Sequence, residues 1–171
     1  MNKTIMIIVI LLLAASLFTA EKAQDFQLEN IKGKMVKLSD FQKEGLVILD
    51  FWASWCVPCK KALPELNKLH KQYENVNVVT ICTDKPRTQP KAIAEVKSHK
   101  YEFHTLLDSK KIVQKQYNII NIPVTIIIAP DGEILLEHTG FKRGDEKHYK
   151  EVIENWLKSL PQSDKKIEES E

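Results

Sequence analysis

Cys56 and Cys59 are separated by two residues, at a point where an apolar segment gives way to a helical pattern. At that spacing both sulfurs fall on the first helical turn, where they can form and break a disulfide. Cys56 then lies at the helix N-terminus, whose unpaired amides and dipole stabilise a thiolate, and Pro58 is tolerated there because an early helical position has no amide partner to lose. We therefore expect Cys56 to attack as a thiolate and Cys59 to resolve the mixed disulfide.

A CxxC pair is also half of a zinc site, so metal binding is the first alternative. The chain has no second CxxC, and His70, the histidine nearest in sequence, lies on the apolar side of its own predicted helix. With no evident second ligand pair, we expect no metal. Cys82 ends an apolar run and is expected to be a small buried hydrophobe rather than a redox partner.

The elements that must position the dithiol alternate along the chain. Strands are predicted over residues 26–28, 35–38, 46–52, 76–82, 103–107, 124–129 and 133–138, and helices over 59–73, 89–99, 110–117 and 145–160. Pro130-Asp131-Gly132 makes the last two strands a hairpin. Strands and helices alternate first, and an antiparallel pair with a closing helix comes last. This order predicts an α/β domain over 25–160, with a central mixed sheet covered by helices on both faces.

Composition is consistent with one compact domain and excludes several function classes. The 171 residues are 43% hydrophobic and carry 25 Lys+Arg against 23 Asp+Glu. This balance gives no electrostatic footprint for nucleic acid, and the apolar content argues against wholesale disorder. Three cysteines cannot form a disulfide-rich scaffold. Lys60 and Lys61 are expected to form a solvated face rather than a recognition patch.

The two ends are expected to lie outside the domain. No charged residue lies between Lys3 and Glu21, and residues 5–15 are all apolar. This pattern is typical of a secretory signal peptide. As a helix, residues 4–20 would span about 25 Å, somewhat under the ~30 Å hydrocarbon core. Residues 1–20 are therefore predicted to be a signal peptide or a retained membrane anchor. Residues 161–171 are polar and predicted to be a flexible tail.

Residues 49–60, Leu-Asp-Phe-Trp-Ala-Ser-Trp-Cys-Val-Pro-Cys-Lys, resemble the active-site segment of thioredoxins. Over 25–160 the longer pattern resembles the exported TlpA/ResA-like thiol-disulfide oxidoreductases. The matching segments, in order, are 33–38, Pro64, 117–119, 122–125 and 131–134. The resemblance implies a thioredoxin fold with a helical insertion between Asp84 and about Leu107. The turn-like residues 30–34, which contain Gly33, separately predict that the first two strands form an N-terminal β-hairpin.

The resemblance also implies roles for individual residues. Pro123 matches the family's cis-proline, which lies against the cysteines and presents the backbone of Ile122 to an extended substrate. Asp50 matches the buried acid of thioredoxins and is expected to take the proton from Cys59 as the mixed disulfide resolves; the alternative is a hydrogen-bonded structural Asp. The residues expected to line the docking surface are Trp55, Val57, Pro58, Ile122 and Pro123, although Trp55 could instead simply pack.

These features predict an exported thiol-disulfide oxidoreductase that acts mainly as a protein disulfide reductase. It would work in the periplasm or at the outer face of a bacterial cytoplasmic membrane, exchange disulfides with protein substrates, need no cofactor and be re-reduced by a membrane thiol reductant. Val57-Pro58 resembles the reductases of this family more than the Pro-His pair of strong periplasmic oxidants.

Two departures from the family pattern bear on its substrate. Many members carry Glu where this chain has Ala62, and Asn where it has Asp50. They argue against carrying over the family's role in cytochrome c maturation, but leave the dithiol chemistry intact.

Two rival functions stay open. The first is a thiol peroxidase of the redoxin group, although the residues before Cys56 lack the Pro-and-Thr pattern that such an enzyme needs. The second is a non-enzymatic metal-binding or chaperone module with this fold.

Overall fold

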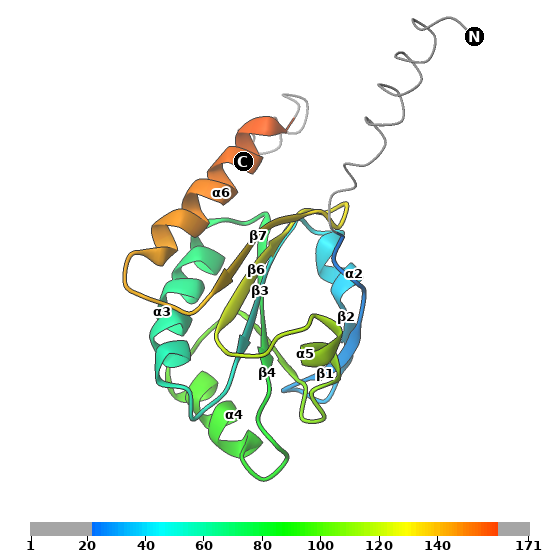
Figure 1. Ribbon diagram of the computed structural model, residues 1–171, viewed down its shortest axis with the longest axis vertical. Helices are drawn as coiled ribbons and strands as arrows, with labels where there is room; N and C mark the ends of the chain where they lie inside the picture. Colours follow the sequence, from blue (N-terminus) through cyan, green and yellow to red (C-terminus); the bar gives the residue numbers. More distant parts are fainter. Residues whose placement is uncertain (1–21, 161–171) are drawn as a thin grey trace, which may run out of the picture.

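The computed structural model describes residues 22–160 (Figure 1). The predicted signal or anchor over 1–20 and the predicted tail over 161–171 lie outside these residues. Among the residues described, no helix is both long and apolar enough to cross a membrane.

A seven-stranded mixed sheet forms the centre of the molecule, in the order β2-β1-β5-β4-β3-β6-β7. The strands are β1 (Gln27–Asn30), β2 (Met35–Lys37), β3 (Leu46–Trp52), β4 (Val76–Cys82), β5 (His104–Leu107), β6 (Val124–Ile128) and β7 (Ile134–Thr139). The three central strands β3, β4 and β5 are parallel to one another. On one side, β6 pairs antiparallel with β3 and β7 pairs antiparallel with β6. On the other side, β1 pairs antiparallel with β5 and β2 pairs antiparallel with β1. The predicted α/β class and the thioredoxin fold are confirmed.

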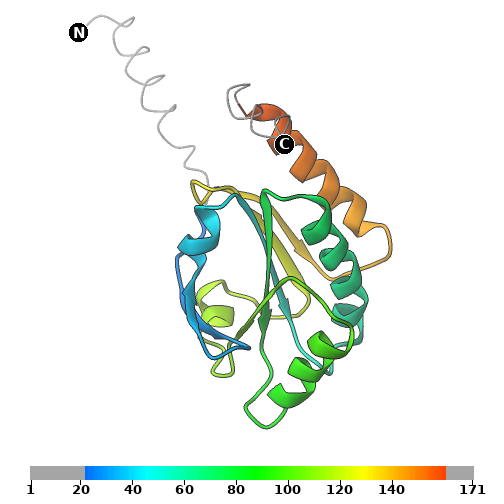
Figure 2. The same cartoon turned by 180° about the vertical axis from the view of Figure 1, so that it is seen from behind.

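Helices cover both faces of this sheet. They are α2 (Leu38–Gln42), α3 (Val57–Gln72), α4 (Gln89–Ser98), α5 (Ile112–Gln116) and α6 (Asp145–Ser159). Figures 1 and 2 show α3, α4 and α6 on one face and the short α2 and α5 on the other. The inserted segment predicted from the resemblance is α4 followed by β5, which pairs with β4 and extends the sheet.

The pleat of β3 divides the core into two layers, because successive side chains of a strand point to opposite faces. All seven residues of β3 are buried. The side chains that pack in the layer of α3, α4 and α6 are Leu46, Ile48 and Trp52, and those in the layer of α2 and α5 are Val47, Leu49 and Phe51. By the same alternation, the acid Asp50 faces the α3 layer, which also contains both cysteines of the CxxC pair.

One element differs from the sequence prediction. The second strand was expected to run through Leu38, but β2 ends at Lys37, and Leu38 begins the five-residue helix α2. The Asp40 carboxylate accepts a hydrogen bond from the Lys37 backbone amide at 3.1 Å and caps this turn. Leu38 and Phe41 are the buried residues of α2, and two apolar positions are too few to show a helical period.

Candidate active site

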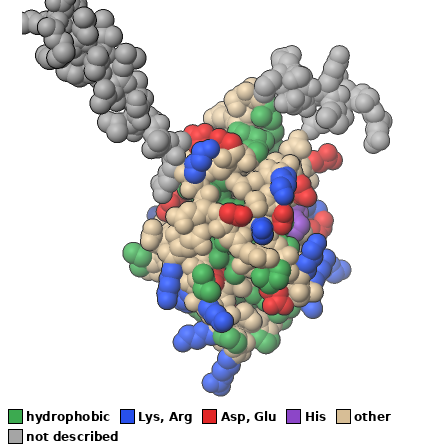
Figure 3. All heavy atoms as spheres, turned by 90° about the vertical axis from the view of Figure 1, so that its right-hand side faces the viewer, with side chains coloured by type: hydrophobic (Ala, Val, Ile, Leu, Met, Phe, Trp, Pro, Cys, Tyr) green, Lys and Arg blue, Asp and Glu red, His purple; other side chains and the backbone are tan. Residues whose placement is uncertain are grey.

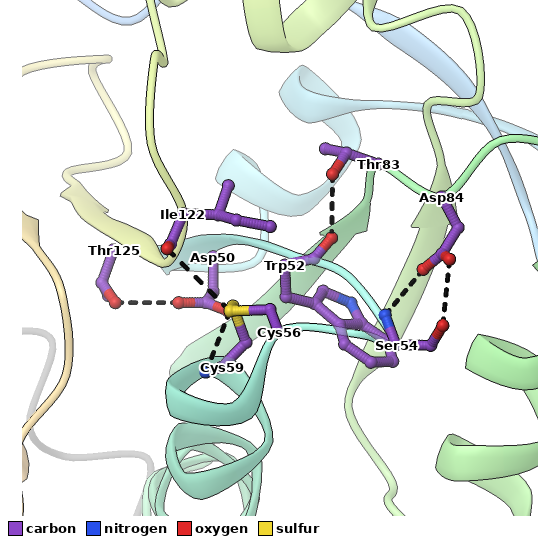
Figure 4. Close-up of a disulfide and its surroundings, with 9 residues drawn as sticks. All are labelled: Asp50, Trp52, Ser54, Cys56, Cys59, Thr83, Asp84, Ile122 and Thr125. Atoms are coloured by element: carbon purple, nitrogen blue, oxygen red, sulfur yellow. Dashed lines mark hydrogen bonds between the residues drawn. A yellow bond between two sulfur atoms is a disulfide. The ribbon is translucent and has the colours of Figure 1, made fainter.

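The two cysteines lie at the junction between the end of β3 and the start of α3. β3 ends at Trp52, and Cys56 is the N-cap of α3 with Pro58 in the first turn. Cys56 and Cys59 form a disulfide with their Cα atoms 5.3 Å apart, and the Cys59 amide donates to Cys56 Sγ at 3.3 Å (Figure 4). Cys56 is 5% exposed and Cys59 is fully buried. Cys56 is thus the sulfur that another protein can reach.

The segment before β6 approaches the same sulfur. The Ile122–Pro123 peptide bond is cis, as the resemblance implied, and the Ile122 carbonyl oxygen lies 3.9 Å from Cys56 Sγ. Trp55 and Val57 flank the disulfide and are 64% and 61% exposed, and Pro58 is exposed too. The large side chain of Trp55 therefore stands in solvent beside the disulfide rather than in the core.

A shallow pocket of about 170 Å³ adjoins these residues and holds Trp55 and Ile122 on its wall. Its remaining wall is formed by Thr83, Lys111, Gln114, Ile120 and Asn121. Ile120 is 88% exposed. The surface around the disulfide is therefore apolar at its centre and open to a polypeptide segment.

Asp50 is fully buried, and its carboxyl group points toward the disulfide in Figure 4. Oδ1 accepts a hydrogen bond from the Thr125 hydroxyl at 2.9 Å, whereas Oδ2 has no partner among the described residues. Burial raises the pKa of Asp50 to about 7, although the bond from Thr125 opposes part of that rise. A carboxyl group with such a pKa and a free oxygen can accept and release a proton near neutral pH.

Asp50 belongs to a row of polar side chains that crosses the sheet at one level. The strand register places Thr105, Thr80, Asp50, Thr125 and His138 next to one another on β5, β4, β3, β6 and β7. The Thr80 and Thr105 hydroxyls are 3.1 Å apart. At the β7 end, the row reaches half-buried His138, whose Nε2 lies 3.0 Å from a carboxylate oxygen of Asp145. Buried polar groups are thus concentrated in one line beneath α3 and α6.

Tyr149 of α6 covers this row. Its ring contacts His138 edge-on, with the centroids 5.7 Å apart, and the residue is fully buried. The Tyr149 hydroxyl, like Asp50 Oδ2, has no hydrogen-bond partner within residues 22–160. With Trp52 Nε1, which also has no partner there, three unpartnered buried polar atoms lie in the layer that holds the dithiol.

A second carboxylate, Asp84, fixes the loop that leads to Cys56. Asp84 accepts hydrogen bonds from the Ser54 amide at 2.7 Å and from the Ser54 hydroxyl at 2.9 Å. Cys82 Sγ lies 3.4 Å from Asp84 Oδ2. Cys82 is fully buried, and burial raises its pKa to about 12, which keeps it a thiol. The expected buried state of Cys82 is confirmed.

The structure brings the expected site residues together: Asp50, Trp55, Cys56, Val57, Pro58, Cys59, Ile122 and Pro123 all lie at or directly beneath the disulfide surface. Ala62 is buried in α3 and brings no acid to the site. Sequence reasoning missed the roles of Thr125 and Asp84. A signal existed for Thr125, since it is the one polar residue in the apolar run 124–129, whereas nothing in the sequence links Asp84 to Ser54.

Comparisons with known proteins agree with this geometry. The model of the AhpC/TSA family matches residues 19–136. The thiol-disulfide oxidoreductase ResA of Bacillus thuringiensis is 31% identical over 140 residues, which cover 82% of this chain and 77% of that protein. This chain belongs to the AhpC/TSA family and is a ResA-like thiol-disulfide oxidoreductase.

Solved structures of the family share the fold. A Chlorobium tepidum protein assigned as a DsbE-type thiol:disulfide interchange protein is 33% identical, with a TM-score of 0.72 over 81% of this chain and 96% of that one. The exposed lipoprotein thioredoxin Etrx1 of Streptococcus pneumoniae is 27% identical, with a TM-score of 0.63 over 80% of this chain and 100% of that one. Family membership implies that this chain exchanges thiols and disulfides with protein substrates.

Proposed function

We propose that this ResA-like protein acts mainly as a protein disulfide reductase, with Cys56 as the attacking group, Cys59 as the resolving group and Asp50 as the proton acceptor. The observation that carries the proposal is the asymmetry of the pair: one sulfur reaches the surface, and the other is buried in the layer that Asp50 faces.

The reaction has two exchanges. The Cys56 thiolate attacks a substrate disulfide, forming a mixed disulfide and releasing one substrate sulfur as a thiolate. Asp50 takes the proton of Cys59, and the Cys59 thiolate then attacks Cys56 Sγ. This step breaks the mixed disulfide, releases the second substrate sulfur and leaves the Cys56–Cys59 disulfide. Two electrons have passed to the substrate, no cofactor is used, and a membrane thiol reductant returns the electrons.

The direction is supported by the modest stabilisation that the site offers to a thiolate. Within the described residues, the Cys59 amide is the one backbone N–H that donates to Cys56 Sγ. A dithiol becomes strongly oxidising when its reduced form is greatly stabilised, and a single charge-assisted hydrogen bond contributes about 1.5–3 kcal/mol. The Val57-Pro58 pair between the cysteines resembles the corresponding pair in reductases of the family, which also supports the reducing direction.

We place the protein outside the cytoplasmic membrane, in the periplasm or on the outer face. The uncharged apolar residues 4–20 support export, and the Streptococcus pneumoniae relative is described as an exposed lipoprotein. Whether residues 1–20 are cleaved or retained decides between a free and an anchored enzyme, and mass determination of the mature protein distinguishes the two.

Trapping and equilibrium experiments test the proposal. In cells, Cys59→Ser is expected to accumulate covalent partners on non-reducing gels, whereas Cys56→Ser is expected to accumulate none. Equal trapping by both variants would contradict the assignment of the two cysteines. The dithiol, equilibrated with glutathione, should have a reduction potential below about −180 mV, the isomerase range; a value well above it would reverse the proposed direction.

A further inference from the structure

The sheet edge that carries the disulfide also carries four pairs of basic residues. β3, β4 and β5 are parallel, so the segments that follow them meet at one edge. The segment after β7 joins them, because the Gly140 amide donates to the Pro123 carbonyl at 2.8 Å. The four pairs, here called the basic edge, are Lys60 and Lys61, Lys85 and Arg87, Lys110 and Lys111, and Lys142 and Arg143.

Four acidic residues of the same segments, Asp84, Asp108, Asp145 and Glu146, offset only part of this charge and leave a formal excess of four positive charges. Asp84 and Asp108 are buried; Asp84 holds Ser54, and Asp108 accepts hydrogen bonds from the amides of Ile112 and Gln114, both at 2.8 Å. The first two residues of α6, Asp145 and Glu146, instead accept hydrogen bonds from backbone amides at the start of that helix.

None of the eight basic side chains forms an ion pair within residues 22–160. Some lysines elsewhere, such as Lys32 and Lys97, are unpaired there as well, whereas Lys68, Lys71 and Lys150 are paired. Figure 3 shows Lys and Arg side chains at the lower end of the face drawn, and others along its right side and in its upper part. The whole chain has a net charge of only +2. The charge at the basic edge is therefore a local concentration.

The centre of the basic edge is apolar, because Trp55, Val57 and Ile120 are exposed there beside the disulfide. Exposed apolar surface rimmed by charged residues marks an interaction site. The surrounding charges stand in solvent and are screened, so they contribute little to any one contact; their combined field instead steers partners of opposite charge.

We propose that the basic edge selects polypeptide substrates in which the disulfide lies beside an apolar side chain and is flanked by carboxylates. This inference rests on the proposed reductase function and adds the charge of its substrates. The apolar side chain would pack against Trp55 and Ile120, while Asp or Glu residues on either side would face the lysines. Such complementarity acts mainly on the rate of encounter and weakens as salt is added.

The test uses three synthetic disulfide-bridged peptides with the same Leu-Cys core, flanked by Glu, Ser or Lys. Their reduction by the dithiothreitol-reduced and desalted protein is followed at about 0.01 M and at about 1 M ionic strength, where the Debye length falls from about 30 Å to about 3 Å. In this single-turnover reaction we expect the second-order rate constant at low salt to be about tenfold higher for the Glu peptide than for the Lys peptide, and the difference to vanish at high salt. Each peptide's rate with free dithiothreitol corrects for its intrinsic reactivity.

A matched pair of quadruple variants assigns the effect to the basic edge. Lys85→Gln, Arg87→Gln, Lys110→Gln and Lys111→Gln together should abolish most of the preference for the Glu peptide. The control removes the same charge from exposed sites elsewhere, Lys32, Lys34, Lys97 and Lys158, and should keep the preference. Equal second-order rate constants for the Glu and Lys peptides, or an equal loss of the preference in both variants, would overturn this inference and leave the proposed reductase function standing. Failure to reduce any of the three peptides would overturn the reductase function and the inference with it.

Discussion

Replacing Asp50 by Asn should make the oxidised protein more stable at alkaline pH. The fold raises the pKa of Asp50 from 3.8 to about 7, so between these values the unfolded chain has released a proton that the folded chain still holds. The free energy of unfolding must therefore fall as pH rises through this interval. A difference of about 3 pKa units at 1.36 kcal/mol each corresponds to a loss of up to about 4 kcal/mol above pH 7.

Urea unfolding of the oxidised proteins between pH 3 and pH 9 measures this loss. The Asp50→Asn variant has no carboxyl group to titrate at this position, so its stability difference from the parent should be small at the acidic end. It should grow to as much as about 4 kcal/mol above pH 7. Thr125→Val, which removes the hydroxyl that lowers this pKa, should move the transition to higher pH. Glu137→Gln, at an exposed position of β7, is the control. A stability difference that is independent of pH would refute the reasoning.

The same variant should be a poorer enzyme. Without a carboxylate to take the Cys59 proton, resolution of the mixed disulfide at neutral pH should slow by about a hundredfold, the lower range for a lost general base. Stopped-flow measurement of product release from a preformed mixed disulfide isolates this step. Release at the parental rate would show that water, rather than Asp50, accepts the proton.

Three further outcomes are expected from local structure. Tyr149→Phe removes a buried hydroxyl that has no partner in the described chain, so it should raise the free energy of unfolding in urea by about 1 kcal/mol. Gly45→Ala should lower it by more than about 3 kcal/mol, because Gly45 has a φ of +145° and an added Cβ would collide with the Asn75 carbonyl; circular dichroism measures the loss. Cys82 should not react with a thiol reagent in the native oxidised protein, since it is fully buried with a pKa raised to about 12, and should react once urea is added.

The central part of the fold could be predicted because its strands are buried on both faces. Residues 46–52 and 76–82 were predicted with the bounds that β3 and β4 have in the structure, since a continuous apolar run between turn signals is typical of such strands. Asp50 attracted attention for the same reason, as an ionisable residue within an apolar run. The short helix α2 was missed, because its formation depends on the Asp40 cap and on tertiary contacts more than on its own pattern.

The surroundings of Asp50 could not be read from the sequence. The polar row joins residues from five strands, and Thr125 is 75 positions from the acid that it contacts. Such neighbours depend on strand order and register, and a shift by one residue would turn each side chain to the opposite face. The basic edge was missed in a similar way: Lys60 and Lys61 alone suggested an ordinary solvated face, and the other three pairs join them only through the topology.

The two outer strands have a consequence for a protein whose substrates are other polypeptides. A long, bare outer strand would let an unfolded client extend the sheet by backbone pairing. Here one outer strand, β2, has only three residues and ends at Lys37, and the other, β7, carries Glu137 and His138 and is followed by Gly140. Short length and charge disfavour such addition. A substrate that binds at the disulfide surface, as proposed, is therefore not also held by pairing with the sheet.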